Sequence, residues 1–135
     1  MQDLLLDLIW VALGSALGGT ARYFVSGVVG RHVGETFPWG TLTVNVTGAF
    51  VIGLFAALAS AHATFSSGAV WPLAITGFLG SYTTVSSFSL QTLTLARDGE
   101  FLRAIGNVAA SLGLCLTVVA LGFAAGSALL GSAVS

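Results

Sequence analysis

The sequence predicts an all-α membrane protein with four transmembrane helices, of which the third is broken. Of its 135 residues, 56% are hydrophobic and 7% are charged, whereas a soluble domain carries about 25% charged residues. No Asp, Glu, Lys or Arg lies between Glu35 and Arg97. A helix needs about 20 apolar residues to cross a bilayer, so the length allows about four crossings with short connections. Residues 1–135 are therefore expected to form one membrane domain.

The first two spans are expected over about residues 8–29 and 41–60. In the first span, Gly14 and Gly18 form a small-xxx-small pair that lets another helix approach closely. The chain starts with acidic residues instead of the positive region of a signal peptide, so we expect the first span to be retained. Pro38-Trp39-Gly40 predicts a turn with an interfacial aromatic residue between the two spans.

The third span is expected over about residues 71–96, with Pro72 in its first turn, where a missing N–H is tolerated. Glycines, serines and threonines are concentrated in residues 77–89 of this span and weaken the helix there. Irregular backbone at membrane depth is tolerated only where it is buried in protein or lines a polar cavity. This stretch is therefore predicted to be the functional centre. The fourth span, about residues 101–130, carries a GxxxG pair at Gly122 and Gly126.

Four crossings place the first and third connections on one side of the membrane and the two termini on the other. The second connection, about residues 61–69, contains His62 and lies with the termini. The four arginines lie on or near the side of the first and third connections: Arg22, Arg31, Arg97 and Arg103. The positive-inside rule assigns that side to the cytoplasm.

Several classes of function lack their residues in this chain. Its two histidines have no Cys or His neighbour at metal-ligand spacing. No carboxylate lies inside a predicted span, so proton-coupled antiport lacks its usual carrier. No basic patch suggests nucleic-acid binding. We therefore expect neither an enzyme nor a nucleic-acid-binding protein.

The polar residues inside the spans each have two interpretations. Asn45 is either the donor of an interhelical hydrogen bond or a donor to an anion in transit, and the residue alone does not decide between these. Asn107, Ser111 and Cys115 share one face of the fourth span. That face either lines a water-filled path or packs against a helix, and the spacing favours packing. For Arg22, snorkelling to the interface is favoured over a role in a pore.

Three motifs, in this order and in a four-span chain of this length, resemble the small fluoride channels of the Fluc/CrcB family. They are Gly18-Gly19-Thr20-Ala21-Arg22-Tyr23, Pro38-Trp39-Gly40-Thr41-Leu42-Thr43-Val44-Asn45, and Gly77-Phe78-Leu79-Gly80 continuing through Thr83-Thr84 to Phe88-Ser89. The third motif is the most specific. The resemblance covers nearly the whole chain.

The resemblance implies an antiparallel, dual-topology dimer with two fluoride pores along its interface. The broken third helices would cross at the centre, where the backbone carbonyls of Gly80 and Thr83 from both subunits would hold a structural sodium ion. Unwound backbone frees carbonyls, and a hard cation prefers oxygen ligands. Residues 80–83 are thus expected to unwind, and residues 84–89 to form the pore wall.

The resemblance also implies roles for individual side chains. Asn45 would donate to fluoride, and Phe88 would turn the positive edge of its ring toward the anion. Arg22 would draw anions to the vestibule of the pore. The full set of expected pore residues is Arg22, Thr41, Asn45, Val85, Phe88, Asn107, Ser111 and Thr117.

Three positions depart from the family pattern. Val85 stands where the family usually has Phe, and a valine has no polarised edge. Asn107 stands where the family often has Tyr, and it remains a donor. Gln91 replaces a frequent Glu, which weakens any carboxylate role in the third helix.

The function implied is passive export of fluoride through a channel in a prokaryotic plasma membrane, with no ATP site. Neutral donors in series replace the water of fluoride and still let the ion leave. The expected partners are fluoride, membrane lipid and a second copy of the chain, and a heterodimer with an oppositely inserted partner stays open because the arginines cluster on one side. Two alternatives stay open: a small multidrug-type exporter, although no glutamate lies in the first span, and a non-transporting membrane assembly protein.

Overall fold

The computed structural model describes residues 2–61 and 68–133, and every regular element in these ranges is a helix. The predicted all-α class is therefore confirmed. In chain order the helices are α1 (Gln2–Val33), α2 (Trp39–Ala61), η2 (Trp71–Leu79), α3 (Gly80–Tyr82), α4 (Val85–Arg97) and α5 (Phe101–Ala133). His62 and most of the predicted connection over residues 61–69 lie outside the described residues.

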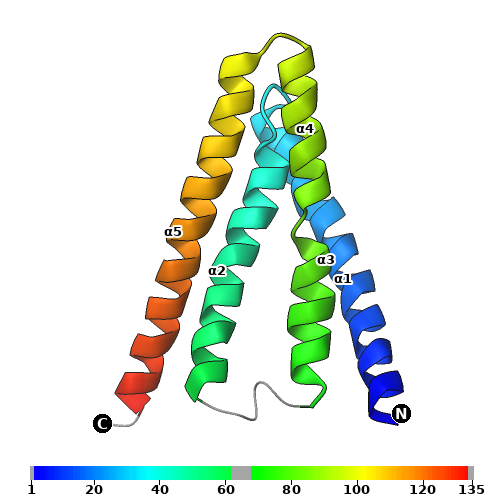
Figure 1. Ribbon diagram of the computed structural model, residues 1–135, viewed down its shortest axis with the longest axis vertical. Coiled ribbons are helices and arrows are strands. Elements are labelled where there is room, and N and C mark those ends of the chain that lie inside the picture. Colours follow the sequence, from blue (N-terminus) through cyan, green and yellow to red (C-terminus); the bar gives the residue numbers. More distant parts are fainter. Residues whose placement is uncertain (1, 62–67, 134–135) are drawn as a thin grey trace.

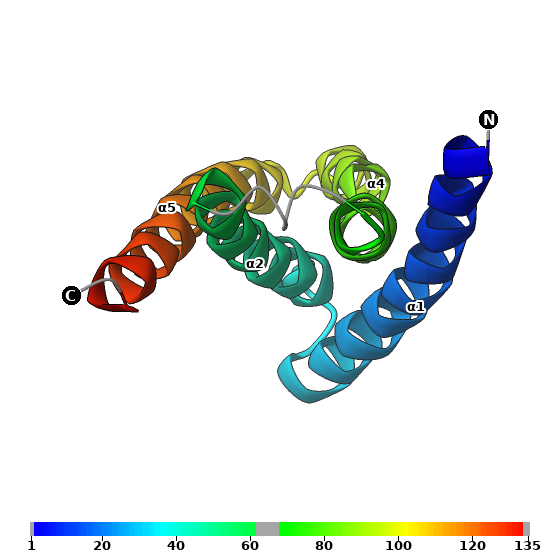
Figure 2. The ribbon, with the colours of Figure 1, turned by 90° about the horizontal axis from the view of Figure 1, so that it is seen from below.

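The helices run along one axis, converge at one end and spread apart at the other (Figure 1). The turn after α1 and the turn after α4 lie together at the narrow end, and the first residues of α1 and the last residues of α5 lie at the wide end (Figure 1). Viewed from below, η2 and α4 lie between α1 on one side and α2 with α5 on the other (Figure 2). The predicted placement of the first and third connections at one end is confirmed.

Three helices are long and apolar enough to cross a membrane: Asp3–Val33, Trp39–Ala61 and Phe101–Leu130. They match the first, second and fourth predicted spans, and the first is longer than expected at both ends. The region of the predicted third span holds the shorter helices η2, α3 and α4. Pro72 lies in the first turn of η2, as predicted, and η2 has the wider turns of a π-helix.

Glycines bring α1 against η2. A Cβ atom added at Gly14 would collide with the Leu73 carbonyl oxygen, and one added at Gly18 would collide with that of Phe78. Gly77 makes the reciprocal contact from η2, because a Cβ atom there would lie 2.7 Å from the Val11 carbonyl oxygen. The predicted role of the Gly14 and Gly18 pair in close helix packing is therefore confirmed.

A second glycine contact joins α2 to α5. A Cβ atom at Gly122 would collide with the carbonyl oxygen of Phe50, and one at Gly126 would lie 2.7 Å from the Ala57 Cβ. Gly53 makes the reciprocal contact, with the Val119 carbonyl oxygen. The GxxxG pair of the fourth span thus packs against the second span.

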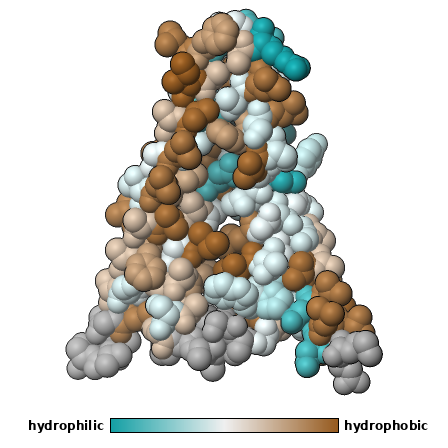
Figure 3. Space-filling model, viewed as in Figure 1, coloured by the Kyte–Doolittle hydropathy of each residue, from teal (hydrophilic) through white to brown (hydrophobic). Residues whose placement is uncertain are grey.

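Much of the surface is apolar. Large hydrophobic side chains stand exposed along α1 and α5, such as Leu17 at 63% and Leu116 at 67%. Figure 3 shows hydrophobic atoms over most of the α5 side, together with a hollow between the two spread arms. Such a surface fits contact with lipid or with another membrane-embedded chain better than contact with water.

Two residues interrupt the helical path between α3 and α4. Thr83 (φ −77°, ψ 158°) and Thr84 (φ −151°, ψ 119°) are extended, whereas Gly80 keeps helical angles of −62° and −31°. The expected unwinding over residues 80–83 is therefore wrong in its position. The reason is that the Thr83 N–H still donates to the Leu79 carbonyl at 3.0 Å, so the helical bonds continue to that point.

Candidate functional site: the break between α3 and α4 and its cavities

The side chain of Asn45, on α2, bonds to the backbone of the break. The Thr84 N–H donates to Asn45 Oδ1 at 2.7 Å, and Asn45 Nδ2 donates to the Thr84 carbonyl oxygen at 3.0 Å. Thr84 is only 6% exposed, so water does not replace these partners. A buried backbone N–H that leaves a helix needs such a partner, because an unpaired one costs about 1–3 kcal/mol.

Thr84 also begins α4. Its Oγ1 accepts from the Ser87 N–H at 3.2 Å, which is the bond of a helix N-cap. The same hydroxyl donates to Ser87 Oγ and shares a hydrogen bond with Ser86 Oγ, both at 3.2 Å. The end of α3 is held by Thr83, whose hydroxyl donates to the Leu79 carbonyl oxygen at 2.9 Å. Side chains thus bond to the backbone on both sides of the break.

A cavity of about 510 Å³, here named the α4 cavity, opens beside the break. Six of the residues predicted for the pore or the cation line it: Asn45, Gly80, Thr83, Val85, Phe88 and Ser111. Its other walls are mainly apolar residues of α2, η2 and α5, with Cys115 among them. No charged side chain lines it, so polar groups act there only as neutral donors, acceptors and dipoles.

A smaller cavity of about 230 Å³, here named the Arg22 cavity, lies on the other side of Thr84. Arg22 and Thr41 line it together with Ser26 and Ser87. Thr84 belongs to the walls of both this cavity and the α4 cavity. Eight of the ten predicted residues therefore gather in two adjacent spaces that meet at the break.

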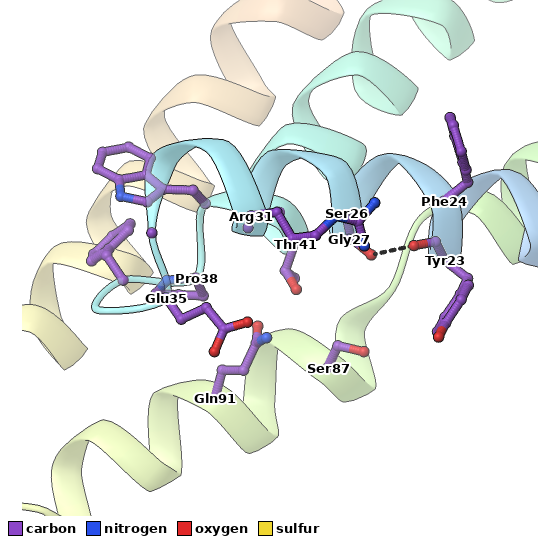
Figure 4. Close-up of a pocket in the computed structure, with 15 residues that line it drawn as sticks. Tyr23, Phe24, Ser26, Gly27, Arg31, Glu35, Pro38, Thr41, Ser87 and Gln91 are labelled. Atoms are coloured by element: carbon purple, nitrogen blue, oxygen red, sulfur yellow. Dashed lines mark hydrogen bonds between the residues drawn. The ribbon is translucent and has the colours of Figure 1, made fainter.

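A third space, here named the outer cavity, has a volume of about 510 Å³ and shares four lining residues with the Arg22 cavity: Tyr23, Ser26, Thr41 and Ser87. It lies between the end of α1, the following turn and α4, and the Glu35 carboxylate lies beside Gln91 there (Figure 4). Gln91 Oε1 is a buried oxygen without a hydrogen-bond partner among the described residues. The three cavities form a series from the narrow end of the molecule to the break.

Two predicted residues lie away from these cavities. Asn107 is 1% exposed, and its Nδ2 donates to Thr92 Oγ1 at 2.8 Å, which ties α5 to α4. Thr117 is exposed on α5, and its hydroxyl donates to the Gly113 carbonyl of the same helix at 2.7 Å. Of the face expected on the fourth span, Ser111 and Cys115 line the α4 cavity, whereas Asn107 makes a helix contact.

The sequence did not indicate that Thr84 would both cap α4 and bond to Asn45, although a threonine just before a helix is a helix-start signal. Ser26, which lines the Arg22 cavity from α1, was not predicted. Ser87 lines that cavity from α4 and lies within residues 84–89, the stretch predicted to form the pore wall. Serines occur at many positions of the chain, so sequence alone does not single out Ser26.

Comparison with known proteins identifies the family of the chain. The family described as "CrcB-like protein, Camphor Resistance (CrcB)" matches residues 9–123. The chain belongs to the CrcB family. Every residue that lines the α4 cavity and the Arg22 cavity lies in the part that matches CrcB.

Curated relatives are similar over most of their length. A protein of Rhodopseudomonas palustris named "Fluoride-specific ion channel FluC 2" is 64% identical over 126 residues, which are 93% of this chain and 96% of the relative. A protein of the same name from Bradyrhizobium diazoefficiens is 65% identical over 116 residues, 85% of each chain. "Fluoride-specific ion channel FluC" of Opitutus terrae is 55% identical over 84% of this chain and 87% of the relative.

Proposed function

We propose that this CrcB chain is a subunit of a fluoride-selective channel that lets fluoride leave the cytoplasm passively. The observation that carries the proposal is the identity of 64% with a relative named as a fluoride-specific ion channel, over 93% of this chain. The chain is accordingly a channel subunit and not an enzyme. The cavities at the break support the proposal, because they bring neutral donors together inside an apolar protein.

The α4 cavity is proposed as part of the fluoride path. Fluoride is small and strongly hydrated, so donors must replace its water, yet fixed cations would hold it too tightly. Asn45 and Ser111 supply an amide and a hydroxyl to this cavity, and Phe88 supplies an aromatic ring. Arg22 stands in the adjacent cavity, where its charge would raise the local anion concentration without a direct place on the path.

The segment η2, α3 and α4 is proposed as the third, interrupted membrane crossing. Residues 71–97 span roughly 35–40 Å at a helical rise, more than the roughly 30 Å of a hydrocarbon core. Together with the three long apolar helices this gives four crossings of a multi-pass protein, in the plasma membrane of a prokaryote. The positive-inside rule favours the orientation in which the ends that carry Arg31 and Arg97 face the cytoplasm, and in an antiparallel copy these ends would face the other side.

A second copy in the opposite orientation is proposed to complete the site. Val85 is 76% exposed although it lines the α4 cavity. A partner packed there would cover this apolar side chain and close the cavity. A homodimer needs only this chain, and a heterodimer with a related subunit remains the alternative that the clustered arginines favour.

The structural sodium ion stays a proposal that rests on the backbone of the break. The Thr84 N–H is bonded to Asn45, so the Gly80 carbonyl lacks the donor that a continuous helix would provide. The Thr83 carbonyl belongs to an extended residue. Carbonyl oxygens suit a hard cation, and two from each of two subunits would converge at a two-fold axis. When bound, the ion would supply positive potential near the anion path.

The proposal is tested by fluoride efflux from liposomes that contain the purified protein, measured with a fluoride electrode. We expect fluoride to leave these vesicles much faster than it leaves protein-free vesicles, while chloride is retained. Equal loss of fluoride and chloride from the vesicles would contradict selectivity for fluoride. Efflux no faster than from protein-free vesicles would favour a non-transporting membrane protein.

A further inference from the structure

We infer that Asn45 is a positioning residue that keeps the break open, because its side chain takes the Thr84 amide hydrogen that would otherwise bond to the Gly80 carbonyl. This inference deepens the proposed channel function and rests on it for its consequence on flux. The contacts of Asn45 carry the structural part independently.

The two bonds of Asn45 fit only an extended Thr84. In a helix, the N–H and the C=O of one residue point in opposite directions along the axis. In an extended residue they point to the same side, as in the paired residues of an antiparallel ladder. One side-chain amide reaches both groups of Thr84, at 2.7 and 3.0 Å, and therefore selects its extended backbone angles.

The same bonds determine whether the Gly80 carbonyl has a hydrogen-bond donor. A continuous helix would join the Thr84 N–H to the carbonyl of the residue four positions earlier, which is Gly80. The last bond of this helical kind comes from the Thr83 N–H to Leu79, at 3.0 Å. The Asn45 side chain thus competes with the Gly80 carbonyl for the Thr84 amide hydrogen. Because Asn45 binds this hydrogen, the carbonyl of Gly80, a residue that lines the α4 cavity, has no helical donor.

Helix α2 is placed close enough for the short Asn side chain to reach. Gly48 lies one turn after Asn45, and a Cβ atom there would collide with the Thr83 Cγ2 methyl group. The small residue therefore lets the α2 backbone approach the break. Longer side chains would not fit as well, since Gln adds a methylene to a packed contact.

The amide group is chemically suited to this task and to the cavity at once. Its oxygen accepts one bond, one N–H donates the other, and the second N–H is left over. Asn45 lines the α4 cavity, so this remaining donor is available to a ligand there. The Asn45 side chain can therefore hold the break through its interhelical bonds and at the same time donate a hydrogen bond to an anion.

The test uses the full-length protein in lipid, with ¹³C-labelled threonine and NMR detection of the Thr84 Cα and Cβ shifts, which distinguish extended from helical backbone. Asn45→Leu keeps the shape but removes both bonds. Loss of a buried hydrogen-bond partner should move the balance between extended and helical Thr84 by roughly 5- to 150-fold. We expect the extended signature to be lost in Asn45→Leu, and its retention would overturn the inference.

Asn45→Asp separates the two bonds of the side chain in one sample. A protonated carboxyl has one donor and one acceptor, like the amide, whereas the ionised group has no donor but still accepts the Thr84 N–H. Because the inference rests on the capture of this N–H, we expect the extended Thr84 signature in Asn45→Asp at acidic pH and its persistence on titration to alkaline pH. Its loss at alkaline pH would assign the break to the bond with the Thr84 carbonyl and contradict the competition between Asn45 and Gly80.

A matched control and a flux measurement separate this inference from the proposed function. Asn107→Leu also removes a buried amide, but one that bonds to Thr92 on α4, and it should leave the Thr84 shifts unchanged. A change there as large as in Asn45→Leu would assign the effect to general loosening and overturn the inference. Fluoride flux by the unaltered protein tests the channel function alone, whatever the NMR outcome.

Discussion

Val85 is the residue whose substitution reports most directly on the α4 cavity. It lies at the first position of α4, lines the cavity and is 76% exposed. A phenylalanine there would add an aromatic edge, which is electrostatically positive. We predict that Val85→Phe raises fluoride efflux from liposomes above that of the unaltered protein. Val85→Leu adds bulk without a ring and serves as the control; an equal gain in both variants would contradict a role for the aromatic edge.

Arg22 offers a second test at the scale of one side chain. Its charge acts from the Arg22 cavity and is screened by salt, since the Debye length is about 10 Å at 0.1 M ionic strength. We predict that Arg22→Gln lowers fluoride efflux several-fold at low ionic strength and less at high ionic strength. Arg103→Gln is the control, because Arg103 pairs with Glu100 at 3.3 Å on the exposed turn. A salt-independent loss in Arg22→Gln would point to a structural role.

The residues of the site were only partly predictable from the sequence. Asn45 stood out because a lone amide in an apolar span must find partners. Its actual partner, the Thr84 backbone, lies 39 positions away in the sequence, and no local pattern relates the two. Thr117 shows the converse: its hydroxyl bonds to its own helix, a choice available to any threonine in a helix. Polar residue type thus indicates a need for partners without identifying them.

At the scale of the helices, the glycine contacts allow a matched pair of substitutions on α1. A Cβ at Gly18 would collide with the Phe78 carbonyl, whereas a Cβ at the neighbouring Gly19 meets nothing within 4 Å. We predict that Gly18→Ala destabilises the protein by about 1–3 kcal/mol, the usual effect of overpacking, measured as a lower midpoint of thermal unfolding in detergent. Gly19→Ala should be neutral or slightly stabilising. Equal effects at both positions would contradict the close contact of α1 with η2.

The contact of α4 with α5 includes a hydrogen bond from Asn107. Its amide donates to Thr92 Oγ1 at 2.8 Å, and that hydroxyl donates to the Phe88 carbonyl at 2.7 Å. We predict that Asn107→Leu lowers the stability by about 1–3 kcal/mol, because a buried network loses a member. Thr117→Val removes an exposed hydroxyl of the same helix and should change the unfolding midpoint little. A midpoint unchanged in Asn107→Leu would show that this network contributes no stability.

The sequence predicted where the long helices lie better than it predicted where the third span is interrupted. The apolar stretches placed the ends of α2 and α5 within three residues and those of α1 within six, because a membrane span is a long and simple signal. The turn predicted at Pro38-Trp39-Gly40 is wrong in its position: the chain leaves the helix over residues 34–38, and Trp39 and Gly40 already belong to α2. The break was expected over residues 80–83 but lies at Thr83 and Thr84. Gly80 is able to leave a helix but is not forced to, and the competition for the Thr84 N–H is decided by α2. A tertiary contact thus sets the boundary that local propensity left open.

At the scale of the whole molecule, the two short turns offer a test of the topology. Both short turns lie at the narrow end (Figure 1), so a label on either turn reports the orientation of the chain. We predict that Asp98→Cys, in a Cys115→Ser background without other cysteines, is labelled by an impermeant maleimide in about half of the molecules in intact cells, as dual topology requires. Complete labelling or none would establish a single orientation and contradict the antiparallel homodimer.

The assembly is the part that one chain cannot specify on its own. The exposed Val85 and the open α4 cavity belong to a surface that fits contact with lipid or with a second subunit, and a single subunit does not show which of them covers it. The sequence carries the topology signal in only four basic residues, too few to fix an insertion direction. The proposed oligomer therefore rests on the family resemblance and on the exposed cavity, and the proposed selective path rests on both.

The most direct test of the central claim is the reversal potential of the purified protein in a planar lipid bilayer, with a fluoride gradient set against an opposite chloride gradient. A passive fluoride-selective channel should carry a current that reverses at the equilibrium potential of fluoride. A current that reverses at the chloride potential, or midway between the two, would contradict fluoride selectivity. No current above that of the protein-free bilayer would contradict conduction itself.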